Sequence, residues 1–179
     1  MPKELLSRKY LPEFVYGGID GAITTFAVVS GAMGASLSSS IILILGFANL
    51  IADGFSMAVS NYLSVKSQTE LHRYHRDYKE LKKLGGHPIK NGIATFLSFI
   101  IIGFIPLISF VIALFFSPMN RYKFAYSFFL TAIALLIVGA VKGEVIKKHW
   151  LRSSIETLLI GSLAAILAFL IGYSLKGLL

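Results

Sequence analysis

The chain has 179 residues, of which 55% are hydrophobic and 15% are charged, and its formal net charge is +8. Its apolar residues gather into blocks of roughly 20, the length that crosses a bilayer, which excludes a soluble fold. The absence of cysteine excludes disulfides, thiolate metal sites and cysteine nucleophiles. We therefore expect an all-α integral membrane protein that forms one transmembrane domain.

Five membrane spans are predicted, joined by short polar connections. The first residues contain no continuous apolar core followed by a small-residue cleavage site, so we expect the first span to stay in the protein. The predicted spans are 14–35, 41–65, 93–116, 124–146 and 155–175.

The distribution of cations predicts the orientation of these spans. With five spans, most of the Lys and Arg residues fall on the side of the N-terminus, and the other side holds only Arg121, Lys123 and Lys176. The positive-inside rule then places the N-terminus in the cytoplasm and the C-terminus outside. The same distribution accounts for the net positive charge, so a bilayer is expected as partner and nucleic acid is not.

The first span carries Asp20 within an apolar segment that is rich in small residues. A carboxylate inside a membrane span is costly and is by default a hypothesis of function. Small residues four apart let helices approach closely, either within one subunit or across a dimer, and the spacing alone does not choose between them. The residues with this spacing are Gly17, Gly21, Ala27, Gly31 and Ala35.

A polar stripe follows one face of the second span. Its members recur every four residues and are Asn49, Asp53, Met57 and Asn61. At about 1.5 Å per residue, Asp20 lies about 9 Å from the cytoplasmic end of its span, and Met57 and Asp53 lie about 12 and 18 Å from theirs. We therefore expect Asp20, Asp53 and Met57 to meet in the inner half of the membrane.

These side chains suit a divalent transition metal. Carboxylate oxygens bind hard divalent cations, and a thioether adds affinity for softer first-row metals such as Fe²⁺. A carboxylate in a partly dry site can also exchange a proton for the metal. The pattern predicts a proton-coupled transporter with Asp20, Asp53, Asn49 and Met57 near the metal. The alternative is a hydrogen-bonded Asp that fixes helix packing, with Met57 as core.

The connection between the second and third spans predicts a short amphipathic helix over residues 66–84, at the cytoplasmic membrane surface. Its apolar residues fall at helical spacing, and Leu84-Gly85-Gly86 with Pro88 marks its end. His72, His75 and Glu80 offer weak metal ligands, but the pattern favours a solvated or headgroup-facing surface.

The last three spans contain few ionisable residues. Pro106 predicts a kink in the third span because proline removes one backbone hydrogen bond. Glu144 lies beside Lys142 and two further lysines, which favours an interfacial salt bridge over metal binding. Ser153 and Glu156 have the spacing of a capping box at the start of the last span. With Asn61, Glu144 and Glu156 are candidates for a cytoplasmic entrance.

Several stretches resemble the vacuolar iron transporter family. The segments DGAITTFAVVSG from Asp20, LGFANLIADGFSMA from Leu45 and NYLSVKSQ from Asn61 resemble that family's first two helices, and RSSIETLLIGSLAA from Arg152 is similar to its last. The resemblance implies a homodimer whose first helices line a metal path. It implies export of Fe²⁺, and in some members Mn²⁺, from the cytosol in exchange for protons. Asp20 and Met57 match the mid-membrane metal positions, and Asp53 belongs to the same motif.

The chain also departs from this family. Ser60 and Asn61 stand where the family has Gly-Glu, so a carboxylate near the cytoplasmic mouth is missing. Iron-storing members insert a Glu-rich domain of three helices between the second and third spans, where this chain has a short connection. It therefore resembles the nodulin-like branch that lacks this domain, which leaves Fe²⁺ versus Mn²⁺ open. The expected location is the plasma membrane of a prokaryote or a vacuole-like organelle of a eukaryote.

Other function classes fit less well. All four His fall in or beside predicted cytoplasmic loops, and no nucleophile with its base is visible, so neither an enzyme nor a resident cofactor is expected. A passive cation channel with a carboxylate ring at a dimer axis is an alternative. A purely structural membrane protein would leave Asp20 and Asp53 unexplained.

Overall fold

The structure, a computed structural model, describes residues 10–74 and 87–178. Within these ranges it is helical and contains no strand, which confirms the prediction of an all-α fold. The elements are α2 (Leu11–Gly34), α3 (Ser39–Tyr74), α5 (Pro88–Gly103), α6 (Ile105–Phe115), the 3-10 helix η1 (Ser117–Arg121), α7 (Lys123–Val145), α8 (Trp150–Leu175) and the 3-10 helix η2 (Lys176–Leu178).

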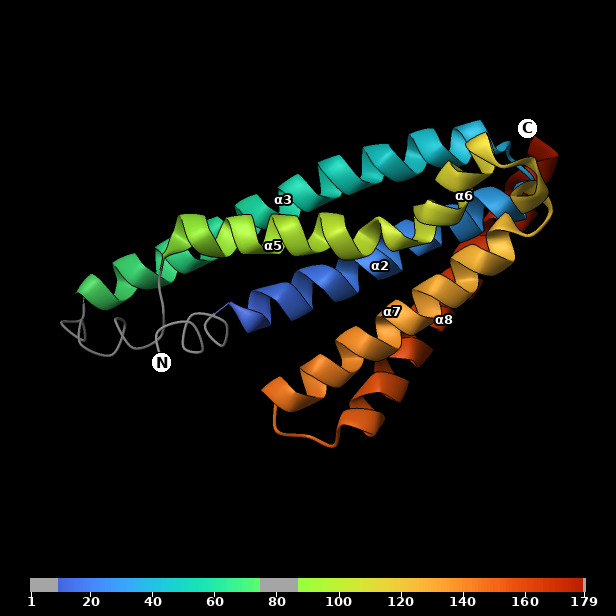
Figure 1. The fold of residues 1–179 in the computed structure, drawn as a ribbon. Helices are drawn as coiled ribbons and strands as arrows, with labels where there is room; N and C mark the ends of the chain where they lie inside the picture. The colour runs from blue at the N-terminus through green and yellow to red at the C-terminus, as the bar shows by residue number, and fades with distance from the viewer. Residues whose placement is uncertain (1–9, 75–86, 179) are drawn as a thin grey trace.

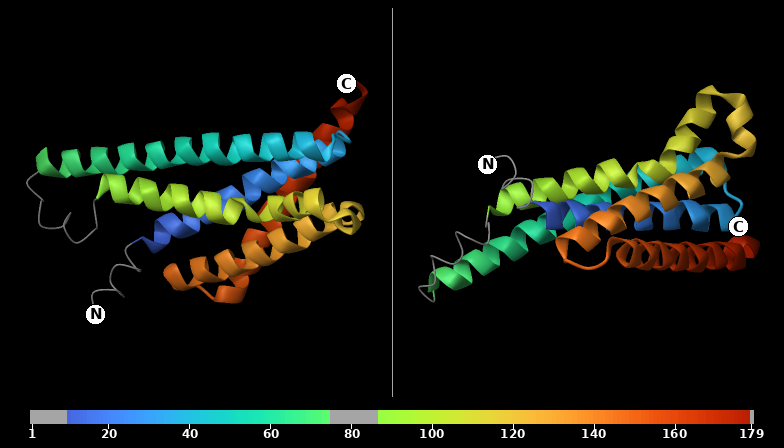
Figure 2. Two further views of the ribbon diagram at one scale, coloured as in Figure 1. Left: turned by 45° about the horizontal axis from the view of Figure 1, so that its top comes forward. Right: turned by 60° about the horizontal axis from the view of Figure 1, so that its bottom comes forward.

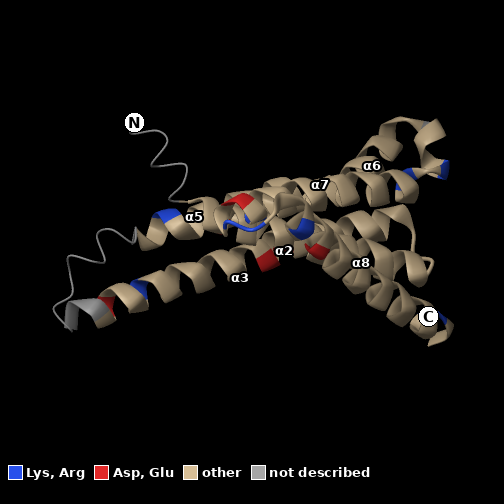
Figure 3. Ribbon diagram, turned by 90° about the horizontal axis from the view of Figure 1, so that it is seen from below, with Lys and Arg blue, Asp and Glu red and all other residues tan. Residues whose placement is uncertain are grey.

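These helices can form a multi-pass membrane protein. α2, α3, α7 and α8 are each long and apolar enough to cross a bilayer, and α5 with α6 can form a fifth, bent span. α2 begins at the same end of the bundle at which α3 ends and α5 begins, and α8 ends at the opposite end (Figure 1). Basic residues lie mostly near helix ends (Figure 3). The cytoplasmic placement of the N-terminus stays a prediction.

The bend between α5 and α6 follows from Pro106. Proline has no backbone N–H and its ring clashes with the carbonyl one turn earlier, so a helix cannot pass through it unchanged. The two helices meet at Phe104 with an angle of 48°. The Pro106 carbonyl accepts a hydrogen bond of 2.6 Å from Ser127 Oγ of α7, which fixes the bend against the next helix. The predicted kink is confirmed.

α2 is the central helix, with α3 and α5 packed along one side and α7 and α8 along the other (Figures 1 and 2). Its glycines allow this packing. A Cβ on Gly21 would lie 2.5 Å from the Phe99 carbonyl oxygen of α5, and one on Gly31 would lie 3.3 Å from the Ala168 carbonyl oxygen of α8. Gly21 and Gly31 of the first span therefore serve packing within one subunit.

α3 extends beyond the predicted second span. It continues without a break to Tyr74, so the expected boundary near residue 65 is not observed. A helix of 36 residues is about 54 Å long, well above the ~30 Å of bilayer hydrocarbon. The rest of the predicted surface helix, with His75 and Glu80, lies outside the described residues, as does the side chain of His72.

Candidate metal site

Asp20 lies near the contact between α2 and α3. Its side chain is partly buried, and its backbone carbonyl accepts a hydrogen bond of 2.9 Å from Thr24 Oγ1. Asn49 of α3 donates its side-chain N–H to the same Thr24 hydroxyl at 3.5 Å. Asn49 therefore faces α2 one helical turn from Asp20.

Asp53 is one turn further along α3 and is also partly buried. Its carboxylate lies within electrostatic range of the Asp20 carboxylate. Among the described residues, neither aspartate forms an ion pair with Lys, Arg or His. Two carboxylates that repel each other without a basic partner are stabilised by a cation between them. This arrangement can hold a positively charged ligand at the α2–α3 contact.

Met57 occupies the next position of the stripe but packs in the core. Its side chain is only 9% exposed and belongs to the same apolar cluster as Leu50 and Phe99. A thioether in this place can fill space or supply a soft ligand at the edge of the carboxylate pair. Its role as a metal ligand stays a prediction.

A cavity of about 360 Å³ reaches Asp20 from the other side, between α2 and the end of α7. The side chains that line it are Pro12, Val15, Tyr16, Ile19, Asp20, Lys142, Val145 and Ile146. Lys142 was expected to contribute to membrane orientation and to a salt bridge with Glu144, whereas its position beside Asp20 depends on how α7 packs. The cavity offers access to Asp20 from the end of the bundle at which α7 ends.

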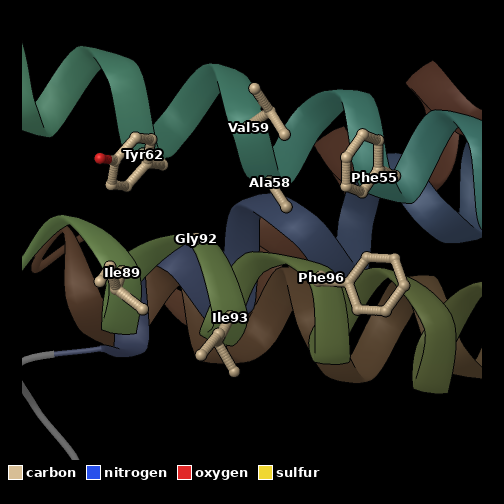
Figure 4. A pocket seen from close by; sticks show the side chains of 8 residues that line it. All are labelled: Phe55, Ala58, Val59, Tyr62, Ile89, Gly92, Ile93 and Phe96. Carbon is tan, nitrogen blue, oxygen red and sulfur yellow. The ribbon is translucent and has the colours of Figure 1, made fainter.

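The groove between α3 and α5 is a different kind of surface (Figure 4). It has a volume of about 280 Å³ and is lined by Phe55, Ala58, Val59, Tyr62, Ile89, Gly92, Ile93 and Phe96. No carboxylate or imidazole lines it, so it does not suit a metal ion. In a membrane this face is suited to lipid chains.

The stripe ends at Asn61 in a polar network that joins three helices. Asn61 Nδ2 donates to Thr95 Oγ1 at 2.6 Å and to the Asn91 carbonyl oxygen at 3.5 Å. Asn91 Nδ2 in turn donates to Glu13 Oε1 at 2.6 Å. Glu13 was not predicted, because the expected first span starts at residue 14, whereas α2 starts at Leu11. An acidic residue in a first helical turn, which the helix dipole favours, was the available signal.

The predicted salt bridge of Glu144 and the predicted capping role of Ser153 are wrong, whereas a place of Glu144 at a cytoplasmic entrance stays a prediction. Glu144 is exposed, and the structure gives no salt bridge for it within the described ranges. α8 begins at Trp150, so Ser153 lies inside the helix, is buried and cannot cap its start. Glu156 instead pairs with Lys142 at 3.6 Å. Because Lys142 lines the cavity that reaches Asp20, its partner Glu156 lies beside this cavity. Glu144 forms no ion pair with Lys142.

No group of three or more His, Asp or Glu side chains that could hold a metal ion is present in the described part of the chain. One chain provides four possible metal ligands at this site: the two carboxylates, the amide of Asn49 and the thioether of Met57. A complete coordination shell would need water or a second copy of the chain.

Comparisons with known proteins bear on the family of the chain. The VIT family model matches residues 11–84 and 73–173. A vacuolar iron transporter of Plasmodium berghei is 29% identical over 229 residues, which covers 96% of this chain and 84% of the relative. Vacuolar iron transporter 1 of Arabidopsis thaliana is 24% identical over 222 residues, which covers 93% and 86%. A vacuolar iron transporter of Toxoplasma gondii is 42% identical over 64 residues, 36% of this chain and 21% of the relative.

The long alignments exceed the 179 residues of this chain, so these relatives contain residues that have no counterpart here. The two matched segments overlap at residues 73–84, where α3 is connected to α5. There the resemblance implied that longer members carry an additional domain. Since the family model matches the chain from residue 11 to residue 173, the chain belongs to the VIT family.

Proposed function

We propose that this protein transports Fe²⁺ or Mn²⁺ out of the cytosol in exchange for protons. The observation that carries the proposal is the Asp20 and Asp53 pair, two carboxylates within electrostatic range and without a basic partner in the described structure. Curated relatives over most of the chain are named vacuolar iron transporters, which supports metal as the substrate.

The ligand chemistry supports a transition metal. Asp20 and Asp53 supply hard oxygen ligands, Asn49 adds an amide oxygen, and Met57 supplies the soft ligand that favours Fe²⁺ over Mg²⁺ or Ca²⁺. Mn²⁺, which prefers oxygen ligands, would use the carboxylates and depend less on Met57. Proton coupling follows if the carboxylates release protons when the metal binds and regain them when it leaves.

A homodimer would complete the site. The exposed face of α3 beside Asn49 and Asp53 carries small residues at every fourth position, namely Ala48, Ala52, Ser56 and Ser60. Such spacing permits close helix contact. In contrast to the glycines of α2, these residues have free surface in a single subunit. Two α3 helices meeting here would bring four carboxylates close to one axis.

The membrane depends on the source of the chain. A vacuole-like organelle fits a eukaryotic protein and the names of its relatives, and the plasma membrane fits a prokaryotic one. Export from the cytosol has the same direction relative to the protein in both cases.

Proteoliposomes test this proposal. With a pH gradient imposed, the wild type should accumulate Mn²⁺, or Fe²⁺ under anaerobic conditions, faster than without the gradient. Asp20→Asn keeps the size of the side chain but removes its charge and should abolish uptake. Glu70→Gln is the matched control because Glu70 is exposed on α3, and it should transport normally.

Two results would contradict the proposal. Uptake that ignores the pH gradient but needs Asp20 would identify a passive cation channel. No uptake of any divalent metal by correctly folded protein would leave a structural role.

A further inference from the structure

Glu13 of α2, which is partly buried, and Asn91 of α5, which is buried, form a pair on the far side of the polar network from α3. The Asn91 amide nitrogen donates to Glu13 Oε1 at 2.6 Å, a short distance for such a bond. Asn91 is only 7% exposed. Ser98 Oγ also donates, at 3.3 Å, to the backbone carbonyl of Glu13, which fixes this turn of α2 against α5.

One side-chain oxygen of each residue has no hydrogen-bond partner within the described part of the chain. Glu13 Oε2 and Asn91 Oδ1 are both buried, and neither takes part in a hydrogen bond. If Glu13 is ionised, both atoms are acceptors and neither can satisfy the other. A buried oxygen left without a hydrogen-bond donor is destabilising, and more so when it is charged.

Among the described residues, no basic side chain forms an ion pair with Glu13. The titratable groups of the described chain on α2 and on the helices packed against it include Asp20, Asp53, Lys66, His87, Lys90, Lys142, Glu144, Arg152 and Glu156. None of them forms an ion pair with Glu13, and Lys142 is paired with Glu156. The neighbouring polar side chains, Thr95 and Asn61, are neutral: Thr95 Oγ1 donates to the Asn91 backbone carbonyl oxygen at 3.0 Å, and Asn61 Nδ2 donates to Thr95 Oγ1 at 2.6 Å.

We propose that Glu13 and Asn91 form a proton-binding site. The proton sits on Glu13 Oε2 and is donated to Asn91 Oδ1, while Asn91 Nδ2 donates to Glu13 Oε1. A carboxylic acid and an amide joined by these two bonds form a closed ring in which all four polar atoms are satisfied. Loss of the proton leaves one bond and two unsatisfied oxygens.

A metal ion fits this pair less well than a proton does. The pair supplies only two oxygens, and no third His, Asp or Glu completes a metal-binding group in the described residues. The pair also connects to the stripe on α3, because the Asn91 carbonyl oxygen accepts from Asn61 and Thr95. Use of this proton in antiport rests on the proposed function, whereas its binding does not.

Infrared difference spectroscopy of the purified full-length protein at pH 7 tests the inference. The wild type should show a carbonyl band of a protonated carboxylic acid that shifts in D₂O. Glu13→Gln should remove this band while keeping the fold, because glutamine can form the same two bonds with Asn91. Glu70→Gln, an exposed control, and Asp20→Asn should retain it.

A second measurement does not depend on any variant folding. Labelling the wild type with ¹³C-glutamate should shift the same band, since it arises from a glutamate and not from an aspartate. A band that persists in folded Glu13→Gln, or no glutamate band at all, overturns the inference. A change in the ionised Glu13 signal on adding Mn²⁺ would also overturn it, because the pair would then bind metal.

The uptake assay separates this inference from the proposed function. If the glutamate band is absent but Asp20-dependent, gradient-driven uptake persists, the proton site fails and the transporter stands. If the band is present and no metal moves, the transporter fails and the proton site stands.

Discussion

Met57 is the residue whose two roles are hardest to separate, because a thioether is both a good core filler and a soft ligand. It lies in the same apolar cluster as Phe99 and follows Asp53 by one turn. Leucine has nearly the same volume but no sulfur, so a substitution can test the chemistry with little change in packing.

We predict that Met57→Leu lowers the affinity for Fe²⁺ about tenfold or more, the lower end of losses seen when groups around a metal are altered. The free energy of unfolding should change by less than about 1.5 kcal/mol. Titration of detergent-solubilised protein with Fe²⁺ and thermal unfolding measure the two quantities. Met33→Leu is the control, because Met33 is partly buried near the C-terminal end of α2. Unchanged affinity in Met57→Leu would mean that Met57 is core alone.

The residues of the site were predictable where they lie on one helix face. A spacing of four placed Asn49 and Asp53 on the side of α3 that meets α2, and Asn49 indeed bonds to Thr24. The contact between Glu13 and Asn91 and the place of Lys142 beside Asp20 were not predictable. They depend on how helices far apart in the sequence pack, and no local pattern reports that.

At the scale of elements, the position of α2 depends on glycines that meet backbone rather than side chains. A Cβ at Gly21 would also lie 3.0 Å from the Phe99 Cα, and backbone cannot move aside as a flexible side chain can. The two helices would have to separate, which would disturb the Glu13 and Asn91 contact as well.

We predict that Gly21→Ala destabilises the protein by about 1–3 kcal/mol, the usual cost of overpacking. Gly177→Ala is the matched control because a Cβ there meets nothing within 4 Å. Thermal unfolding in detergent compares the two. Equal stability of both variants would show that α2 and α5 do not approach closely in the folded protein.

Hydropathy and proline predicted the membrane helices and the bend at Pro106, because both depend on composition over a short stretch. Helix ends were less predictable. α3 continues to Tyr74 and α8 starts at Trp150, since helical hydrogen bonds can continue into polar sequence once a helix is established. The capping box at Ser153 failed for this reason.

At the scale of the whole molecule, the exposed faces of α3 and α8 differ in the size of their side chains. The exposed small residues of α3 suit close contact with another helix, whereas the exposed side chains of α8, such as Leu163 at 58% exposure, are large and suited to lipid. Because the chain contains no cysteine, one introduced thiol can report on each surface without a background.

We predict that Ala52→Cys forms a covalent dimer under mild oxidation in membranes, because the proposed α3 contact brings the two copies of this position together. Leu163→Cys on α8 should stay monomeric on a non-reducing gel. Cross-linking in Leu163→Cys but not in Ala52→Cys would contradict the prediction, because it would place the interface on α8 instead of α3.

The central position of α2 limits which substitutions the protein tolerates during evolution. Half of the residues in the apolar window of α2 are buried, against 6% in that of α8. Most substitutions in α2 therefore alter contacts with several helices, while the outer face of α8 accepts almost any apolar replacement. In a saturation mutagenesis library, tolerated variants should gather on α8, and α2 should retain nearly its present sequence.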